Sequence, residues 1–195
     1  MKHSALVRAS KRISRHLRHA PHEIGLELEP GGWVAVDDLL AALARHGVRL
    51  TRAELDEVVA GNDKRRFGYD ETGRRIRANQ GHTVRVELDL PVATPPDVLY
   101  HGTVEHVLDA IRREGLRPMR RHDVHLSTSP DTATAVGARR GRPVVLTVDA
   151  HAMHAAGHRF RVSANGVWLV PHVPPRFLRA ESHVLLDQPP DTSRR

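Results

Sequence analysis

The stretch TRAELDEVVAGNDKRRFGYDETGRRIRA, residues 51–78, decides how the first half of this chain folds. Thr51 and Glu54 have the spacing of a capping box, in which each side chain bonds a free backbone N–H at the start of a helix. Beyond the helix, residues 66–69 and 74–78 carry strand-forming side chains on either side of a turn signal, Asp-Glu-Thr-Gly. The stretch therefore predicts a short helix followed by a β-hairpin.

Two further helices are expected before this stretch. Residues 4–20 place apolar side chains every three or four positions with arginines between them, which predicts an amphipathic helix that ends before a proline. A strand is expected over 33–36, followed by a helix that Asp37 or Asp38 caps. Three helices followed by a hairpin is the order of a winged-helix module, so we expect residues 1–90 to form a nucleic-acid-binding lobe.

The boundary of that lobe is marked by prolines. Residues 84–90 alternate apolar and polar side chains and predict one more strand, and the prolines that follow break the pattern. We therefore place a linker at 91–97 and a second lobe at 98–187. Residues 188–195 contain Pro, Asp, Ser and Arg without an aliphatic or aromatic side chain, so this tail is expected to be disordered.

The second lobe is predicted to be a mixed α+β structure rich in strands. Strands are expected over 98–101, 124–127 and 144–148, and helices over 107–115 and 132–137. Gly102 and Thr103 are interpreted as a tight exit from the first of these strands. Asn165-Gly166 lies between two strand-forming segments and is the strongest short hairpin signal in the chain.

Composition narrows the function. The formal net charge is +7, and the excess is arginine, because the chain has only three lysines. Arginine favours planar, bidentate recognition of phosphate, so a nucleic-acid partner is favoured. The absence of cysteine excludes disulfides, thiolate catalysis and cysteine-based zinc sites. No run approaches roughly 18 apolar residues and the N-terminus lacks a signal-peptide pattern, so a soluble, cytoplasmic protein without membrane association is expected.

Common cofactor and metal motifs are missing. The chain has neither the G-x-G-x-x-G dinucleotide fingerprint after a strand nor a Walker A motif, so any nucleotide must be held in another way. His151, His154 and His158 could be drawn as metal ligands, but the run lacks carboxylate or cysteine partners. We therefore expect no metal site.

Four clusters of polar residues are candidates for chemistry. Arg18 and His19 end the first predicted helix, where they are either phosphate ligands or a solvated helix end. Residues 62–67 and 76–83 make both ends of the hairpin basic, which is consistent with catalysis or with simple contact to a nucleic-acid backbone.

The other two clusters lie in the second lobe. His101 ends a predicted strand beside Gly102, which would let a ligand approach the backbone closely; alternatively, His101 is a structural histidine. The loop 119–127 and the run 139–142 are basic, and the alternative for both is a solvated basic surface.

Together these segments resemble the Tpt1/KptA family of NAD-dependent RNA 2'-phosphotransferases, over about residues 4 to 180. The resemblance rests on seven ordered motifs: Leu17-Arg18-His19-Ala20-Pro21, Ile24-Gly25-Leu26, Gly32-Trp33 with Val36-Asp37, Asn62-Asp63-Lys64 with Arg66-Phe67, Ile76-Arg77-Ala78-Asn79-Gln80-Gly81-His82, Tyr100-His101-Gly102-Thr103 and Val124-His125-Leu126-Ser127. Thr83 stands where the family commonly has serine, a departure that keeps the hydroxyl.

The resemblance implies a winged-helix RNA lobe joined to a lobe of the ADP-ribosyltransferase type. Family members remove an internal RNA 2'-phosphate, typically one left at a tRNA splice junction. The phosphate displaces nicotinamide from NAD to give a 2'-phospho-ADP-ribosylated RNA, which then yields 2'-hydroxyl RNA and ADP-ribose 1'',2''-cyclic phosphate. No metal is required, and a monomer is expected.

The resemblance also assigns site residues. The family's catalytic Arg-His-Arg-Arg set falls on Arg18, His19, Arg66 and Arg121, rather than on the neighbouring Arg65 and Arg120. NAD would be contacted by His101, Gly102, Thr103 and Ser127, with Arg139 and Arg140 as further candidates.

Two other functions remain open at this point. The protein could transfer ADP-ribose to a terminal RNA or DNA phosphate and leave it there as a cap. It could also be a non-catalytic winged-helix nucleic-acid-binding protein, although the matches at all four catalytic positions argue against that alternative.

Overall fold

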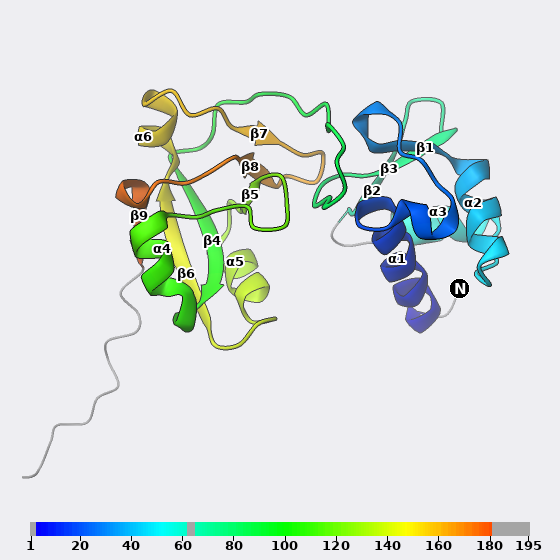
Figure 1. The fold of residues 1–195 in the computed structure, drawn as a ribbon, viewed down its shortest axis with the longest axis horizontal. Helices are drawn as coiled ribbons and strands as arrows, with labels where there is room; N and C mark the ends of the chain where they lie inside the picture. Colours follow the sequence, from blue (N-terminus) through cyan, green and yellow to red (C-terminus); the bar gives the residue numbers. More distant parts are fainter. Residues whose placement is uncertain (1–2, 62–64, 181–195) are drawn as a thin grey trace, which may run out of the picture.

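The computed structural model describes residues 3–61 and 65–180, which form two lobes, each with its own hydrophobic core. The first core is built from buried residues between Ala9 and Ala78, and the second from buried residues between Leu99 and Phe177. Figure 1 shows the lobes side by side, joined by an extended connection. Within the described ranges, no helix is long and apolar enough to cross a membrane.

The first lobe contains three α-helices and a three-stranded antiparallel sheet. In chain order its elements are α1 (His3–Arg18), the 3-10 helices η1 (Pro21–Ile24) and η2 (Pro30–Gly32), β1 (Trp33–Ala35), α2 (Val36–Arg45), α3 (Arg52–Ala60), β2 (Phe67–Tyr69) and β3 (Arg75–Ala78). Strand β3 is central, between β1 and β2. The predicted sequence of three helices and a hairpin is therefore present.

The predicted helix starts differ in outcome. The capping box of α3 is confirmed, since the Thr51 side chain accepts a hydrogen bond from the backbone N–H of Glu54, and the Glu54 carboxylate accepts one from the backbone N–H of Thr51 at 2.9 Å. The predicted cap of α2 is wrong. That helix begins at Val36 directly after β1, with Ala35 at the N-cap, so Asp37 and Asp38 lie inside its first turn. There their negative charges still interact favourably with the positive N-terminal end of the helix dipole.

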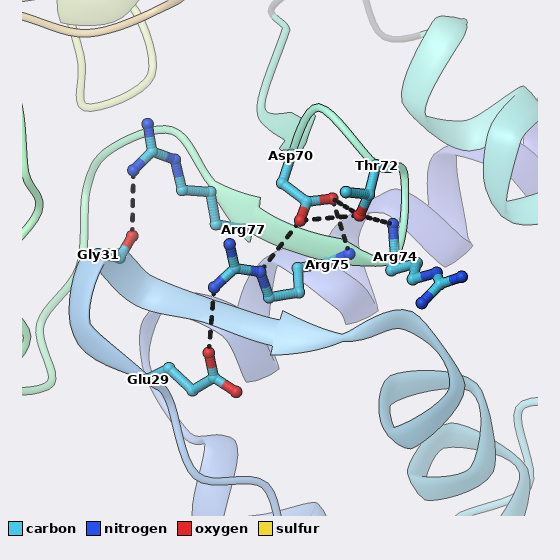
Figure 2. A network of polar contacts seen from close by, with 7 residues as sticks. All are labelled: Glu29, Gly31, Asp70, Thr72, Arg74, Arg75 and Arg77. Atoms are coloured by element: carbon cyan, nitrogen blue, oxygen red, sulfur yellow. Dashed lines mark hydrogen bonds and ion pairs between the residues drawn. The ribbon is translucent and has the colours of Figure 1, made fainter.

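The β2–β3 hairpin is confirmed, and the Asp70 carboxylate holds its turn together. It accepts hydrogen bonds from the backbone N–H and the Nε of Arg75, both at 3.0 Å, and from the Thr72 hydroxyl (Figure 2). These bonds lower the pKa of Asp70 to about 2. Gly73 has φ +67°, the left-handed conformation that such a turn requires.

Two arginines of β3 attach the hairpin to β1. Arg75 reaches Glu29 at 3.5 Å, and Arg77 donates to the backbone oxygen of Gly31 at 3.3 Å (Figure 2). Both guanidinium groups also lie over the ring of Trp33, Arg77 with its Cζ 4.4 Å from the ring centroid and Arg75 at 5.5 Å. The hairpin is therefore tied through β3 to residues 29–33.

The predicted strand over residues 84–90 is wrong. The apolar side chains of this segment are half-buried and the polar ones exposed, as the alternation predicts, but the segment joins none of the sheets of the described residues. Its backbone instead makes scattered bonds, such as that from Gly31 N–H to the oxygen of Glu87 at 2.9 Å. Further along, Ala93 N–H bonds the oxygen of Phe160 in the second lobe at 3.0 Å. The limits of the linker at 91–97 stay a prediction.

The second lobe has two three-stranded antiparallel sheets, β4-β6-β9 and β5-β8-β7. Its elements are β4 (Val98–Val104), η3 (Glu105–Val107), α4 (Leu108–Glu114), β5 (Val124–Leu126), α5 (Pro130–Gly137), β6 (Pro143–Asp149), α6 (Ala150–Ala155), β7 (Arg161–Val162), β8 (Trp168–Val170), η4 (Pro175–Phe177) and β9 (Leu178–Ala180). A backbone bridge between Tyr100 and Ser127 joins the two sheets.

Most predicted elements of this lobe are confirmed, and one is corrected. The hairpin at Asn165-Gly166 is present as β7–β8. The predicted exit at Gly102-Thr103 is wrong, because β4 continues to Val104. The strand is longer because β6 provides an antiparallel partner for every residue of β4. The predicted disordered tail lies outside the described residues.

Candidate active site

Arg18 and His19 lie where α1 ends and the connection between the lobes passes. The backbone oxygen of Arg18 accepts hydrogen bonds from the N–H groups of Thr83 at 2.9 Å and Val84 at 3.3 Å. The Thr83 hydroxyl lies 3.0 Å from Nδ1 of His19. The segment after β3 thus satisfies the last turn of α1, and the hydroxyl of Thr83 orients the imidazole of His19.

The guanidinium of Arg18 is held in an electropositive and largely buried place. Its Nη2 donates to the backbone oxygen of Arg66 at 3.3 Å, whereas its Nε is buried and has no hydrogen-bond partner among residues 3–61 and 65–180. Its pKa is lowered to about 10, first by burial and then by the charges of Arg66 and Arg121. The pKa of His19 is also lowered, by burial and then by Arg18, Arg121 and Arg15. An anion at this place would relieve the repulsion among these groups.

Arg66 enters the site from the start of the hairpin. The backbone oxygen of Arg66 accepts from Asn79 N–H at 2.9 Å, and the Asn79 side chain donates to the oxygen of Arg65 at 2.6 Å. Arg65 has φ +40° and is exposed, while the backbone oxygen of Arg66 accepts from Arg18 and its Nη1 donates to the hydroxyl of Ser10 at 3.4 Å. Burial and then the charge of Arg139 lower the pKa of Arg66. The motif at 62–64 lies outside the described residues.

Arg121 comes from the second lobe, on the loop before β5. Its Nη1 lies 2.8 Å from Nδ1 of His125. The pKa of His125 is lowered to about 3, by burial and then by Arg121, Arg18 and His101, so its ring is neutral near pH 7 and Nδ1 can accept the hydrogen bond. Burial and then Arg140 and Arg139 lower the pKa of Arg121 itself.

Gly81 lies next to side chains of both lobes. Its φ is +87°, and a Cβ built there would lie 3.8 Å from Nη1 of Arg18 and 3.7 Å from Cε1 of His125. Arg18 from the first lobe and His125 from the second therefore both border the space that a side chain on Gly81 would fill. The structure brings Arg18, His19, Arg66 and Arg121 into one cationic cluster drawn from both lobes.

His101 on β4 adjoins this cluster. Its Nδ1 donates to the backbone oxygen of His125 at 3.0 Å, which leaves Nε2 as an acceptor in the neutral ring. Burial lowers the pKa of His101, the hydrogen bond to His125 opposes that shift, and Arg140 and Arg121 lower it further. Arg139 and Arg140 are exposed residues just after α5, and their charges act on Arg66, Arg121 and His101.

The remaining predicted NAD contacts have structural partners of their own. The Ser127 hydroxyl donates to the backbone oxygen of Ser129 and lies 3.2 Å from it. Thr103 is buried. A Cβ on Gly102 would lie 1.7 Å from the backbone oxygen of Ala133, so α5 occupies the space that this glycine leaves. The absence of a side chain at Gly102 thus allows helix α5 to approach the backbone of β4 closely.

No role was predicted from the sequence for His125 and His82. Both lie in the quoted motifs, so position in a motif was the available signal. His82 is 3% exposed, and neither of its ring nitrogens has a hydrogen-bond partner in the described structure. Its pKa is lowered to about 4 by burial and then by Arg18, His122, His19 and Arg77.

One cavity adjoins the cluster and another does not. The first, of about 310 Å³, is lined partly by Gly81, His82 and His125. The second, of about 380 Å³, is lined by residues of β4, β6, α6 and β9 and by Asp97, and by none of the cluster residues. Residues 3–61 and 65–180 contain no group of three His, Asp or Glu side chains placed to hold a metal ion.

Comparison with known proteins connects this geometry to an activity. The family model described as RNA 2'-phosphotransferase, Tpt1/KptA family, matches residues 4–172. A probable RNA 2'-phosphotransferase of Streptomyces griseus is 67% identical over 179 residues, covering 88% of this chain and 95% of the relative. One of Trichormus variabilis is 53% identical over 178 residues (91% and 98%), and one of Burkholderia pseudomallei 52% over 173 residues (89% and 94%).

Proposed function

Because this chain belongs to the Tpt1/KptA family of RNA 2'-phosphotransferases, we propose that it transfers an internal RNA 2'-phosphate to NAD. A phosphate oxygen forms a bond to C1'' of the nicotinamide ribose as the bond to nicotinamide breaks. The O2'' hydroxyl then loses its proton and attacks the phosphorus. The bond from phosphorus to the RNA 2'-oxygen breaks, and that oxygen takes up a proton. The products are nicotinamide, 2'-hydroxyl RNA and ADP-ribose 1'',2''-cyclic phosphate.

The cationic cluster is the observation that carries this proposal. Arg18 contacts the backbone of Arg66, and Arg66 and Arg121 both depress the pKa of Arg18. Among the described residues, no carboxylate contributes to the pKa shifts of Arg18 and Arg121. A phosphate carrying up to two negative charges has the charge and the size to satisfy such donors, and arginine matches it bidentately.

In the first step the cluster orients the phosphate. A phosphate is already anionic, so it needs no general base to act as a nucleophile, and nicotinamide is activated as a leaving group by its own positive charge. We assign Arg18, Arg66 and Arg121 to binding the phosphate oxygens so that one of them faces the ribose carbon.

The second step requires charge stabilisation and proton movement. Charge builds on a phosphorus surrounded by oxygens, and donors placed in advance lower that barrier. His19 is assigned to a hydrogen bond with the phosphate and to proton transfer. Burial and its cationic neighbours lower the pKa of His19. A bound phosphate would oppose that effect and raise the pKa of His19 toward the range useful for a general acid.

The residues near His101 suit a nucleotide. His101 has an acceptor at Nε2 that could receive a ribose hydroxyl, and Arg140 and Arg139 add positive charge suited to a pyrophosphate. We propose that these residues, with Thr103 and Ser127, hold NAD, and that Gly102 acts by allowing α5 to pack. We also propose that residues 1–90 form a winged-helix lobe for RNA and residues 98–187 an ADP-ribosyltransferase-like lobe.

The test is a reaction with NAD and an RNA that carries one internal 2'-phosphate. We expect free nicotinamide, 2'-hydroxyl RNA and ADP-ribose 1'',2''-cyclic phosphate in equal amounts, measured by chromatography and mass spectrometry. A parallel reaction uses the same RNA with a 5'-terminal phosphate instead. If ADP-ribose stays on the terminal phosphate and the internal 2'-phosphate is untouched, the protein is an end-capping transferase and the proposal is wrong.

A further inference from the structure

His125 contacts three parts of the proposed site. Its Nδ1 lies 2.8 Å from Nη1 of Arg121, and its backbone oxygen accepts from His101 at 3.0 Å. Its Cε1 lies 3.7 Å from the position that a Cβ on Gly81 would take, and Nη1 of Arg18 lies 3.8 Å from that same position. His125 is therefore the residue through which a proposed phosphate ligand and a proposed nucleotide ligand are joined.

The partner that orients Arg121 differs from those of other arginines in this chain. Arg15, Arg52, Arg75 and Arg161 each lie against a carboxylate oxygen at 2.6 to 3.0 Å. Among the ion pairs of the part of the chain that the structure describes, none includes Arg121. A carboxylate would hold the guanidinium in place but would also neutralise much of its charge.

A neutral imidazole holds the guanidinium without that cost in charge. Burial and the surrounding cations keep the ring of His125 uncharged, so Nδ1 presents a lone pair to Arg121. Arginine has five N–H donors, and one is used here, which leaves the others for an anion. The repulsion from Arg139 and Arg140 would otherwise favour other orientations of Arg121.

We propose that His125 is a positioning residue, whose Nδ1 accepts a hydrogen bond from Arg121 and aims that guanidinium at the 2'-phosphate while preserving its full charge. This inference rests on the proposed function, because it assumes that Arg121 binds the phosphate of the RNA.

The test measures RNA binding, so it does not depend on turnover. Fluorescence anisotropy gives the Kd of two RNAs that differ only in carrying an internal 2'-phosphate or a 2'-hydroxyl. The variants are His125→Asn, whose amide oxygen can take the place of Nδ1, His125→Leu, which has no acceptor, Arg121→Ala, and the double variant. His154→Leu, an exposed histidine on α6, is the matched control. Thermal unfolding of each variant shows whether it is folded.

We expect His125→Leu to weaken binding of the 2'-phosphate RNA by about tenfold or more, the range for a hydrogen bond to a charged group. His125→Asn should stay within about threefold of the wild type, and neither should change binding of the 2'-hydroxyl RNA. In the Arg121→Ala background, His125→Leu should have no further effect, because a residue that acts through another is not additive with it.

Two results would overturn the inference. If His125→Leu weakens binding equally with and without Arg121, the two residues act independently. If His125→Asn is as defective as His125→Leu while folded, an acceptor at Nδ1 is not what the site requires. A wild-type protein that binds the two RNAs equally would instead overturn the proposed function, and with it this inference.

Discussion

The Arg18 guanidinium combines burial, a hydrogen bond to Arg66 and a buried Nε without a partner in the described structure. Such a group is stabilised most when negative charge develops beside it. In the proposed reaction, that charge develops on the phosphate in the second step. We expect Arg18→Ala to slow that step by about 100-fold or more and the first step less, so that 2'-phospho-ADP-ribosylated RNA accumulates. Gel electrophoresis of the RNA over time measures the intermediate.

Arg12→Ala is the control for this experiment, since Arg12 lies on the same helix and is exposed, with a long bond to the backbone of His46. It should leave both steps unchanged. A fall in turnover of Arg18→Ala without accumulated intermediate would show that Arg18 acts mainly in the first step or in binding.

His82 should make stability depend on pH. Its pKa is about 4 in the folded protein and near 6.5 when exposed, so folding favours the neutral ring. The stability is fully present above pH 6.5 and is lost as the pH falls toward 4, by about 3 kcal/mol at pH 4. His82→Leu should therefore flatten the fall in the free energy of unfolding between pH 7 and pH 4.

Urea unfolding at pH 7, 5.5 and 4 measures this difference, with His46→Leu as the exposed control. Other histidines with lowered pKa values, such as His125, contribute to the wild-type dependence and cancel in the comparison. If His82→Leu and the control lose stability in parallel as the pH falls, His82 is not held neutral by the fold.

At the level of elements, the contact between β4 and α5 depends on Gly102. A Cβ there would lie 1.7 Å from the backbone oxygen of Ala133, so the helix must move away from the strand that carries His101. We expect Gly102→Ala to lower the free energy of unfolding by about 3 kcal/mol or more. Gly157→Ala, in open space with φ +89°, should cost only about 1–2 kcal/mol for its left-handed backbone.

Urea unfolding distinguishes the two glycine variants. The same variants can be examined for NAD binding by calorimetry at a temperature at which both are folded. Gly102→Ala that is as stable as Gly157→Ala would mean that α5 can shift without loss. A loss of NAD affinity with unchanged stability would indicate direct contact of Gly102 with NAD.

At the level of the whole molecule, the proposed phosphate site needs both lobes. Arg66 comes from the first and Arg121 from the second, so each should contribute to the salt dependence of RNA binding. Arg66→Gln and Arg121→Gln should each lower the slope of log Kd against log salt by about 0.7 for single-stranded RNA. Arg112→Gln, on α4 and paired with Asp109 at 2.7 Å, should leave the slope unchanged.

Anisotropy titrations at several salt concentrations provide the slopes. A slope that changes for Arg66→Gln but not for Arg121→Gln would mean that RNA contacts the first lobe alone. That result would place the phosphate elsewhere than in the cluster between the lobes.

Local chemistry in the sequence was sufficient for several elements and for part of the site. The capping box at Thr51, the β2–β3 hairpin and the Asn165-Gly166 turn were predicted because each depends on residues close in the chain. The end of α1 before Pro21 was predicted for the same reason, and the helix stops at Arg18.

The tertiary structure decided what depends on partners distant in sequence. An alternating segment becomes a strand only when another backbone pairs with it, so residues 84–90 form none, and β4 extends to Val104 because β6 lies beside it. β9 was not predicted, and it too exists through its pairing with β6. The motif resemblance identified Arg18, Arg66 and Arg121 as site residues. Their mutual repulsion, and the contact of Arg121 with the neutral ring of His125, exist only because the fold brings the two lobes together. There burial strengthens interactions that water would otherwise screen.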